Sequence, residues 1–289
     1  MFIPFHYYDP KSFAEFLEIA RQVKDYQILA GGTDLLVKMR GGYSPCQHVL
    51  DIKKIQDIPE LKKIEKNQEG LSLGSLVTFT ELLNYKEGKD FFPALYEASR
   101  VMGCYEIRNR ATFGGNICNA ASGAEAGSVF LIFNAVVHIL GPQGKRSVLL
   151  EEFYQARSKT GKPGTILGPE EIVTHFFLPF LPGKNHSVYV RRARSAGMDL
   201  SSLNLSLAMF EENGKKNFRI AAGAIGPIPC RFREVEELLS GNDLDCSQIE
   251  NAQKKLSDLS QPRPNSKRAS VEYKKDQISQ LLVVALNSI

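Results

Sequence analysis

Three kinds of segment are missing from this 289-residue chain, and each absence argues against a class of protein. No apolar run approaches the roughly 20 residues that a membrane-spanning helix needs. Residues 1–6 (MFIPFH) lack the basic-then-apolar order of a secretory signal peptide. The net charge is only +4 and the basic residues are scattered, which disfavours nucleic-acid binding. We therefore expect a cytoplasmic protein that binds neither a membrane nor a nucleic acid.

Metal-binding patterns are missing as well. The five cysteines show no C-x-x-C spacing, and their odd number argues against a disulfide framework. The five histidines are dispersed and form no H-E-x-x-H pattern. We expect neither a zinc site nor an iron–sulfur cluster, because no set of thiolates has the spacing of cluster ligands.

Two glycine doublets stand out among what is present, in residues 30–34 (AGGTD) and 112–116 (TFGGN). Glycine allows a positive φ and a close approach of the backbone to a ligand, so that successive N–H groups can converge on an anion. The first doublet lies between an apolar run at 26–30, a predicted buried strand, and a predicted short helix at 35–39. Two such turns facing each other could hold the diphosphate of a dinucleotide. Neither is the G-x-G-x-x-G of a Rossmann unit, and a pair of ordinary tight turns is the alternative.

The length of the chain predicts two or three lobes. We expect a β–α–β lobe over residues 1–57, a second lobe over 58–178, and a C-terminal α+β domain over 179–289 with an antiparallel sheet backed by helices. Helix starts are predicted at the S-x-x-E and T-x-x-E capping boxes that begin at Ser12 and Thr78. Residues 159–165 are predicted to form a loop.

The sequence around the two doublets resembles the two flavin-binding signatures of the FAD subunits of molybdenum hydroxylases. The similarity continues in the same order along nearly the whole chain. The sequence is most similar to the bacterial xanthine dehydrogenase type. The resemblance implies the vanillyl-alcohol-oxidase-like (PCMH-type) FAD-binding fold, an α+β fold of two α/β lobes with a C-terminal domain like that of the carbon monoxide dehydrogenase flavoprotein. The segments that carry it are 29–36 (LAGGTDLL), 108–120 (RNRATFGGNICNA), 168–173 (GPEEIV), 189–191 (YVR), 196–200 (AGMDL) and 268–273 (RASVEY).

The same resemblance implies which residues bind FAD. The first turn is expected to hold the diphosphate through backbone N–H groups, and the second to form the opposite wall. No residue is expected to act as a catalytic acid, base or nucleophile. The expected FAD-binding set is Leu29, Ala30, Gly31, Gly32, Thr33, Asp34, Leu35, Met102, Gly103, Thr112, Gly114, Gly115, Asn116, Glu125, Val173, Arg191 and Leu200.

Four of these positions have a second interpretation from the residues themselves, and Leu200 has one role only. Glu125 stands where relatives have a ribose-binding Asp, and a solvated surface acid is the alternative. Met102 and Val173 are equally typical of core residues. Arg191 stands where relatives have Lys near the flavin, where a cation favours electron uptake, although an exposed strand arginine is common. Leu200 occupies the position that packs on the flavin ring.

The function implied is an electron-transfer flavoprotein subunit, with purine hydroxylation as the overall chemistry. A molybdopterin-containing large subunit would oxidise the substrate, a [2Fe–2S] small subunit would relay electrons, and FAD in this chain would pass them to NAD⁺. The alternatives are the flavin subunit of a nicotinate, carbon monoxide or aldehyde dehydrogenase, a free-standing FAD oxidoreductase of the same fold, and a flavin-free scaffold.

Overall fold

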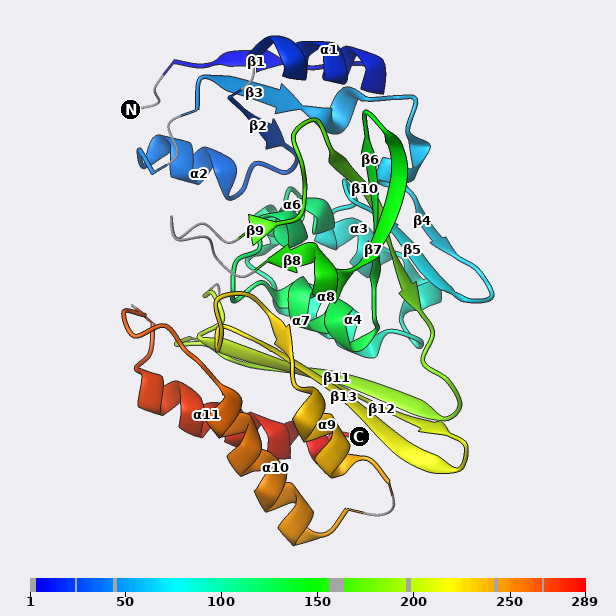
Figure 1. Ribbon diagram of the computed structural model, residues 1–289, viewed down its shortest axis with the longest axis vertical. Coiled ribbons are helices and arrows are strands. Elements are labelled where there is room, and N and C mark those ends of the chain that lie inside the picture. The colour runs from blue at the N-terminus through cyan, green and yellow to red at the C-terminus, as the bar shows by residue number, and fades with distance from the viewer. Residues whose placement is uncertain are drawn as a thin grey trace.

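The chain contains three stacked units, each built on its own sheet (Figure 1). The computed structural model describes residues 4–23, 25–43, 46–155, 164–195, 199–241, 244–266 and 268–289. The predicted loop at 159–165 and the segment 196–200 therefore lie largely outside the described residues. In the part of the chain that is described, no helix has the length and apolarity to cross a bilayer.

The N-terminal unit is a small parallel sheet in the order β1-β3-β2, with the helix α1 packed against it. Ser12 Oγ accepts a hydrogen bond from Glu15 N at 3.2 Å, which caps α1 as predicted, while the Glu15 carboxylate accepts from Lys11 N at 2.6 Å. The predicted β–α–β unit is confirmed, with one additional strand, β1, ahead of it. Its elements are β1 (His6–Tyr8), α1 (Phe13–Val23), β2 (Tyr26–Leu29), α2 (Leu35–Arg40) and β3 (His48–Asp51).

The second unit is an antiparallel sheet in the order β4-β5-β10-β6-β7, with a layer of helices against one face. Thr78 and Glu81 form the complete capping box predicted for α3, and Pro93 opens α4. The strands are β4 (Ile64–Lys66), β5 (Gly70–Gly74), β6 (Val136–Gly141), β7 (Gly144–Leu149) and β10 (Ile172–Pro179). The helices are α3 (Phe79–Asn84), α4 (Pro93–Val101), α5 (Tyr105–Arg108), α6 (Phe113–Cys118), α7 (Glu125–Ile132) and α8 (Leu150–Phe153). Short 3-10 turns and a two-stranded ribbon complete it: η1 (Ile52–Lys54), η2 (Pro59–Lys62), η3 (Lys86–Gly88), β8 (Tyr154–Gln155) and β9 (Gly164–Thr165).

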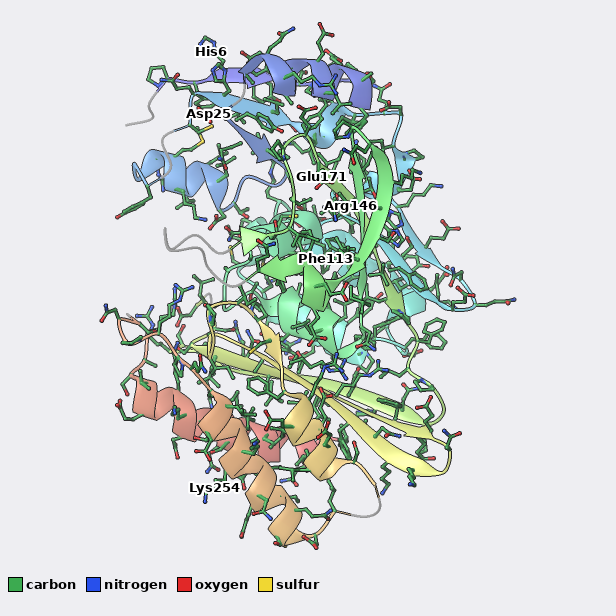
Figure 2. All side chains as sticks on the ribbon, viewed as in Figure 1. His6, Asp25, Phe113, Arg146, Glu171 and Lys254 are labelled. Atoms are coloured by element: carbon green, nitrogen blue, oxygen red, sulfur yellow. The ribbon has the colours of Figure 1, made fainter. Side chains whose placement is uncertain are left out.

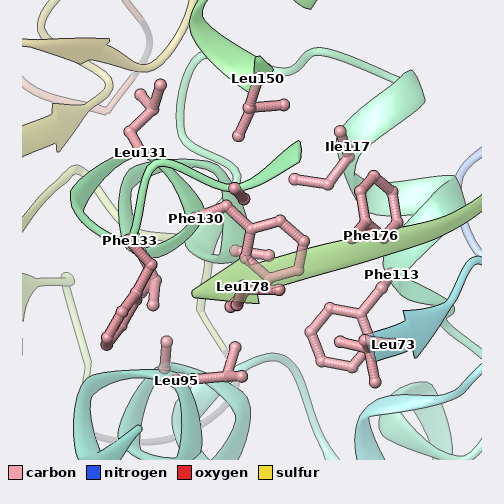
Figure 3. Close-up of a cluster of buried hydrophobic side chains, with 14 of the residues drawn as sticks. Leu73, Leu95, Phe113, Ile117, Phe130, Leu131, Phe133, Leu150, Phe176 and Leu178 are labelled. Carbon is pink, nitrogen blue, oxygen red and sulfur yellow. The ribbon is translucent and has the colours of Figure 1, made fainter. Parts of the chain in front are cut away.

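Aromatic side chains fill the core between this sheet and its helices (Figure 3). Phe113, Phe130 and Phe176 come from α6, α7 and β10, and each is fully buried. The Phe113 and Phe130 rings lie 5.8 Å apart, and the Phe130 ring meets Phe176 edge-on at 5.2 Å. Since Phe113 directly precedes the second glycine doublet in the turn 112–116, this core fixes the position of that turn.

The C-terminal unit is an antiparallel sheet in the order β11-β12-β13-β14, which has helices on both faces (Figure 1). Along β12, Leu203, Leu205 and Leu207 pack toward α9–α11, while Ala208 and Phe210 pack toward α4 and α7. A sheet backed by helices was predicted, but α10 was not, and the second helix layer belongs to the preceding unit. The elements are β11 (Asn185–Arg192), β12 (Leu203–Glu212), β13 (Lys215–Gly223), β14 (Cys230–Arg231), α9 (Arg233–Leu239), α10 (Cys246–Leu259) and α11 (Val271–Leu286). The division of the chain at residues 57 and 178 stays a prediction.

Two histidines stack across neighbouring strands of the second sheet. His138 of β6 pairs with His175 of β10, and their rings lie 4.1 Å apart with planes 7° from parallel. Thr174 Oγ1 donates to the His138 carbonyl at 3.2 Å, so toward His175 Nδ1, 3.0 Å away, this hydroxyl acts as an acceptor. Burial lowers the pKa of both rings, and the neighbouring His138 helps to lower that of His175 to about 4.

The histidine pair predicts a loss of stability in acid. The folded state binds fewer protons than the unfolded chain between the ordinary pKa of 6.5 and the lowered value of about 4, so stability is lost as the pH falls through this range. Because His175 is only half-buried, we expect a contribution on the order of 1–2 kcal/mol. Urea unfolding at pH 7.5 and 4.5 should show a smaller acid loss for His175→Gln than for wild type. The exposed His186 provides a control, and an equal acid loss in wild type and His175→Gln would contradict the prediction.

Candidate functional site

The first turn, residues 30–34, presents unused backbone donors. The N–H groups of residues 31–35 have no hydrogen-bond acceptor among the described residues. Gly32 has φ +77°, a conformation that side-chain-bearing residues rarely adopt. Consecutive free N–H groups at the start of α2 can bind an anion such as a diphosphate.

The second turn, residues 112–116, uses its donors internally. Gly114 N donates to the Ser75 carbonyl at 2.8 Å, Gly115 N to Thr112 Oγ1 at 3.0 Å, and Asn116 N to the Thr112 carbonyl at 2.9 Å. Thr112 thus caps α6. The free amides therefore lie in the first turn, whereas those of the second turn are already bonded within the protein.

Two features of the second turn still fit a bound cofactor. Asn116 Oδ1 is buried and has no hydrogen-bond partner in the described part of the chain. A Cβ built on Gly115 meets only Thr112 Oγ1, at 3.1 Å, so little of the protein lies against this glycine. A carbonyl oxygen needs a donor, which a ribose or ribityl hydroxyl supplies and a phosphate oxygen does not. The residues present therefore fit FAD, with hydroxyl recognition added to diphosphate binding.

The two turns touch each other through their backbones. A Cβ added to Gly31 would lie 1.9 Å from the Arg110 carbonyl oxygen and 3.1 Å from Ala111 Cα, so only glycine permits the contact. Lys38 of α2 extends the junction, because its Nζ donates to Asn119 Oδ1 at 2.8 Å and pairs with Asp34 at 2.5 Å. The structure thus brings the two predicted turns together.

A network of polar side chains contacts the first turn at the Ala30 carbonyl. Lys53 Nζ donates to the Ala30 carbonyl at 2.9 Å and pairs with the buried carboxylate of Asp51 at 2.8 Å. Tyr7 Oη donates to the other Asp51 oxygen at 2.7 Å. Neither Lys38 nor Lys53 was predicted, although the four-residue spacing of Asp34 and Lys38 gave a signal for an ion pair on a helix.

Met102 and Gly103 form a turn that ends α4, where Gly103 has φ +52°. Arg108, which was not predicted, donates from Nη1 to both carbonyls of this turn, at 3.1 and 3.3 Å. The Met102 side chain is 9% exposed and packs in the large core. Its core interpretation is therefore confirmed for the side chain.

Val173 lies in β10, also with its side chain in the core. The preceding turn is pinned to β7 by a two-pronged ion pair between Arg146 and Glu171, with distances of 2.8 and 2.7 Å (Figure 2). Arg146 lowers the pKa of the Glu171 carboxyl. The ion pair thus fixes the turn at residues 168–171, which leads into the central strand β10, against the edge strand β7.

Glu125 is buried, which overturns its interpretation as a solvated surface acid. It begins α7, is 4% exposed, and accepts a hydrogen bond from Ser201 Oγ at 3.1 Å. Burial raises the pKa of the Glu125 carboxyl, and hydrogen bonds, including that from Ser201, only partly offset the effect.

Arg191 and Leu200 meet in the same region. Arg191, half-buried on β11, donates from Nη1 to the Asp199 carbonyl at 3.2 Å. The Asp199 carboxylate pairs with Arg194 at 3.2 Å and Arg268 at 3.0 Å. The Leu200 side chain is 60% exposed, which leaves an apolar surface available on an anchored loop.

Comparison with known proteins adds independent information. The family model described as the FAD binding domain in molybdopterin dehydrogenase matches residues 3–181, and that of the CO dehydrogenase flavoprotein C-terminal domain matches residues 188–289. The chain is 30% identical over 272 residues to the xanthine dehydrogenase FAD-binding subunit of Escherichia coli O157:H7, covering 93% of this chain and 90% of that one. The nicotinate dehydrogenase FAD-subunit of Eubacterium barkeri is 27% identical over 278 residues, covering 95% and 92%.

A solved structure shares the fold. The carbon monoxide dehydrogenase of Hydrogenophaga pseudoflava contains a chain that superposes with a TM-score of 0.91 at 24% identity, covering 99% of this chain and 97% of that one. The predicted α+β FAD-binding fold is confirmed by this match.

We expect a glycine-to-alanine substitution to have different effects in the two turns. Gly115→Ala should leave the thermal stability of the cofactor-free protein near wild type but lower FAD affinity at least tenfold, about 1.4 kcal/mol, because the methyl group enters the cofactor's space. Gly31→Ala should also destabilise the cofactor-free protein, by about 1–3 kcal/mol, because it forces the turns apart. Thermal melts and FAD titrations measure both quantities.

Gly168→Ala is the matched control, since its Cβ would meet nothing closer than Glu171 Oε2 at 3.4 Å. Wild-type FAD affinity in Gly115→Ala would remove the second turn from the cofactor site.

Proposed function

The chain belongs to the family of FAD-binding subunits of molybdenum hydroxylases, and we propose that it takes electrons from a [2Fe–2S] subunit and passes them to NAD⁺. The organic substrate, a purine such as xanthine, would be oxidised in a molybdopterin-containing large subunit. Two observations support the purine assignment. The chain is 30% identical to a xanthine dehydrogenase FAD-binding subunit, and the sequence of residues 111–119 resembles that type.

The observation that carries the proposal is the contact between an amide-rich first turn and a second turn with an unpartnered Asn116 oxygen. FAD, when bound, supplies the exchange between single electrons and electron pairs. We propose that residues 31–35 bind its diphosphate and that Asn116 accepts from one of its hydroxyl groups. Gly31 and Lys38 keep the two turns in contact, so the binding surface is formed before the cofactor arrives.

The residues near the flavin would position and tune it rather than react. Arg191 places a positive charge beside the Asp199–Leu200 loop, where the resemblance places the flavin ring. The Leu200 side chain offers apolar contact without hydrogen bonds. An aliphatic cover of this kind would leave the face of the ring less hydrogen-bonded, which would suit access by a nicotinamide.

A reconstitution experiment tests the subunit assignment. The isolated chain with FAD should absorb near 450 nm, and NADH should bleach this band. Xanthine plus NAD⁺ should give no turnover until the molybdopterin and iron–sulfur subunits are added. Xanthine oxidation by the rigorously purified chain alone would contradict the assignment. A band that NADH leaves unchanged would reject NAD⁺ as the acceptor.

Arg191 provides a separate test. Arg191→Ala should lower the two-electron midpoint potential of the bound flavin by about 30 mV, equivalent to ~1.4 kcal/mol, because a charge favouring electron uptake is lost. FAD affinity should change little, since the turns hold the diphosphate. Arg191→Lys keeps the charge and should retain the potential. An unchanged potential in correctly folded Arg191→Ala would show that the guanidinium does not act on the flavin.

A further inference from the structure

Glu125 lies at the junction between the helix layer of the second unit and the C-terminal sheet. It is the first residue of α7, nine positions after Asn116 of the second turn. Ser201, which donates to its carboxyl group at 3.1 Å, is 3% exposed and lies just before β12. The carboxyl group is therefore directed into protein, although the resemblance places a ribose ligand at this position.

The chain around Glu125 is attached to the C-terminal sheet at several more points. Ser128 Oγ lies 2.9 Å from Asn204 Oδ1 and 2.9 Å from Ser206 Oγ. Ala224 N donates to the Ser122 carbonyl at 2.5 Å. The side chains of Ser128, Asn204 and Ser206 are all fully buried, so residues 122–128 and the start of β12 form one rigid polar contact.

The loop that carries Leu200 is fixed at each neighbouring residue. Asp199 is held by two arginines, and Arg268 Nη1 also donates to the Leu200 carbonyl at 3.2 Å. Ser201 is held by Glu125, and Ser202 N donates to the Arg192 carbonyl at 2.8 Å. Among residues 199–202, only Leu200 is exposed.

We propose that Glu125 is a positioning residue that fixes Leu200 against the flavin through Ser201, and that it is not a ribose ligand. This inference rests on the proposed function, because that function places the flavin at Leu200. It connects the start of α7 to the flavin cover through the Glu125 carboxyl group. The hydrogen bond from Ser201 needs an acceptor oxygen on residue 125, which an amide also supplies, so Glu125→Gln should keep the contact.

The test compares Glu125→Ala, Glu125→Gln, Ser201→Ala and the Glu125→Ala/Ser201→Ala double variant, with Glu250→Ala on the exposed face of α10 as control. We expect Glu125→Ala and Ser201→Ala to keep FAD affinity within threefold of wild type. Both should shift the flavin midpoint potential and speed hydrogen exchange in residues 199–206. The double variant should shift no more than either single one, and Glu125→Gln should behave as wild type.

Two results would overturn the inference. A tenfold loss of FAD affinity in both Glu125 variants, with Ser201→Ala unaffected, would make Glu125 a cofactor ligand. Wild-type exchange and potential in Glu125→Ala would show that the contact positions nothing. If Glu125→Ala does not fold, Ser201→Ala and Glu125→Gln carry the test. If no protein, including wild type, binds FAD, the proposed function fails, while hydrogen exchange still reports whether Glu125 holds the loop.

Discussion

The proposed cofactor site depends on a contact between two backbones. Gly31 lies so close to Arg110 and Ala111 that no side chain fits between them. This contact joins the N-terminal unit to the second unit, and the Lys38–Asn119 hydrogen bond lies beside it. Because the second turn has used its own donors, the free amides of residues 31–35 define where negative charge can bind. In the proposed site the first turn would thus set the position of the anion, and the second turn would form the wall opposite it.

Much of the fold is predictable from local signals. The capping box at Thr78, the proline at the start of α4 and the apolar run before the first turn each specify a helix or strand within a few residues. Gly32 is predictable for the same reason, since a tight turn needs its positive φ. The D-x-x-Q capping box at Asp245 gave a similar signal for α10, which the sparse apolar residues of that helix concealed.

The environment of a side chain is harder to predict than its secondary structure. Glu125 is buried where α7 packs on the C-terminal sheet, and Ser201, 76 residues later, supplies a hydrogen bond to its carboxylate there. All eight residues of α7 are buried, so the helix lacks the polar stripe by which a surface helix is recognised. Lys38 reaches Asn119 across 81 residues. Such contacts depend on how the units pack, which no local pattern encodes.

The layer formed by α4 and α7 serves as a common wall for two sheets, one on each side. Helix α7 contributes Phe130 to the core of the second sheet and Ser128 to the polar contact with β12. Its residues must therefore match two surfaces at once. A C-terminal domain taken from a relative would meet a helix face shaped for another partner, so recombination at the domain boundary must carry the facing positions of α7 with it.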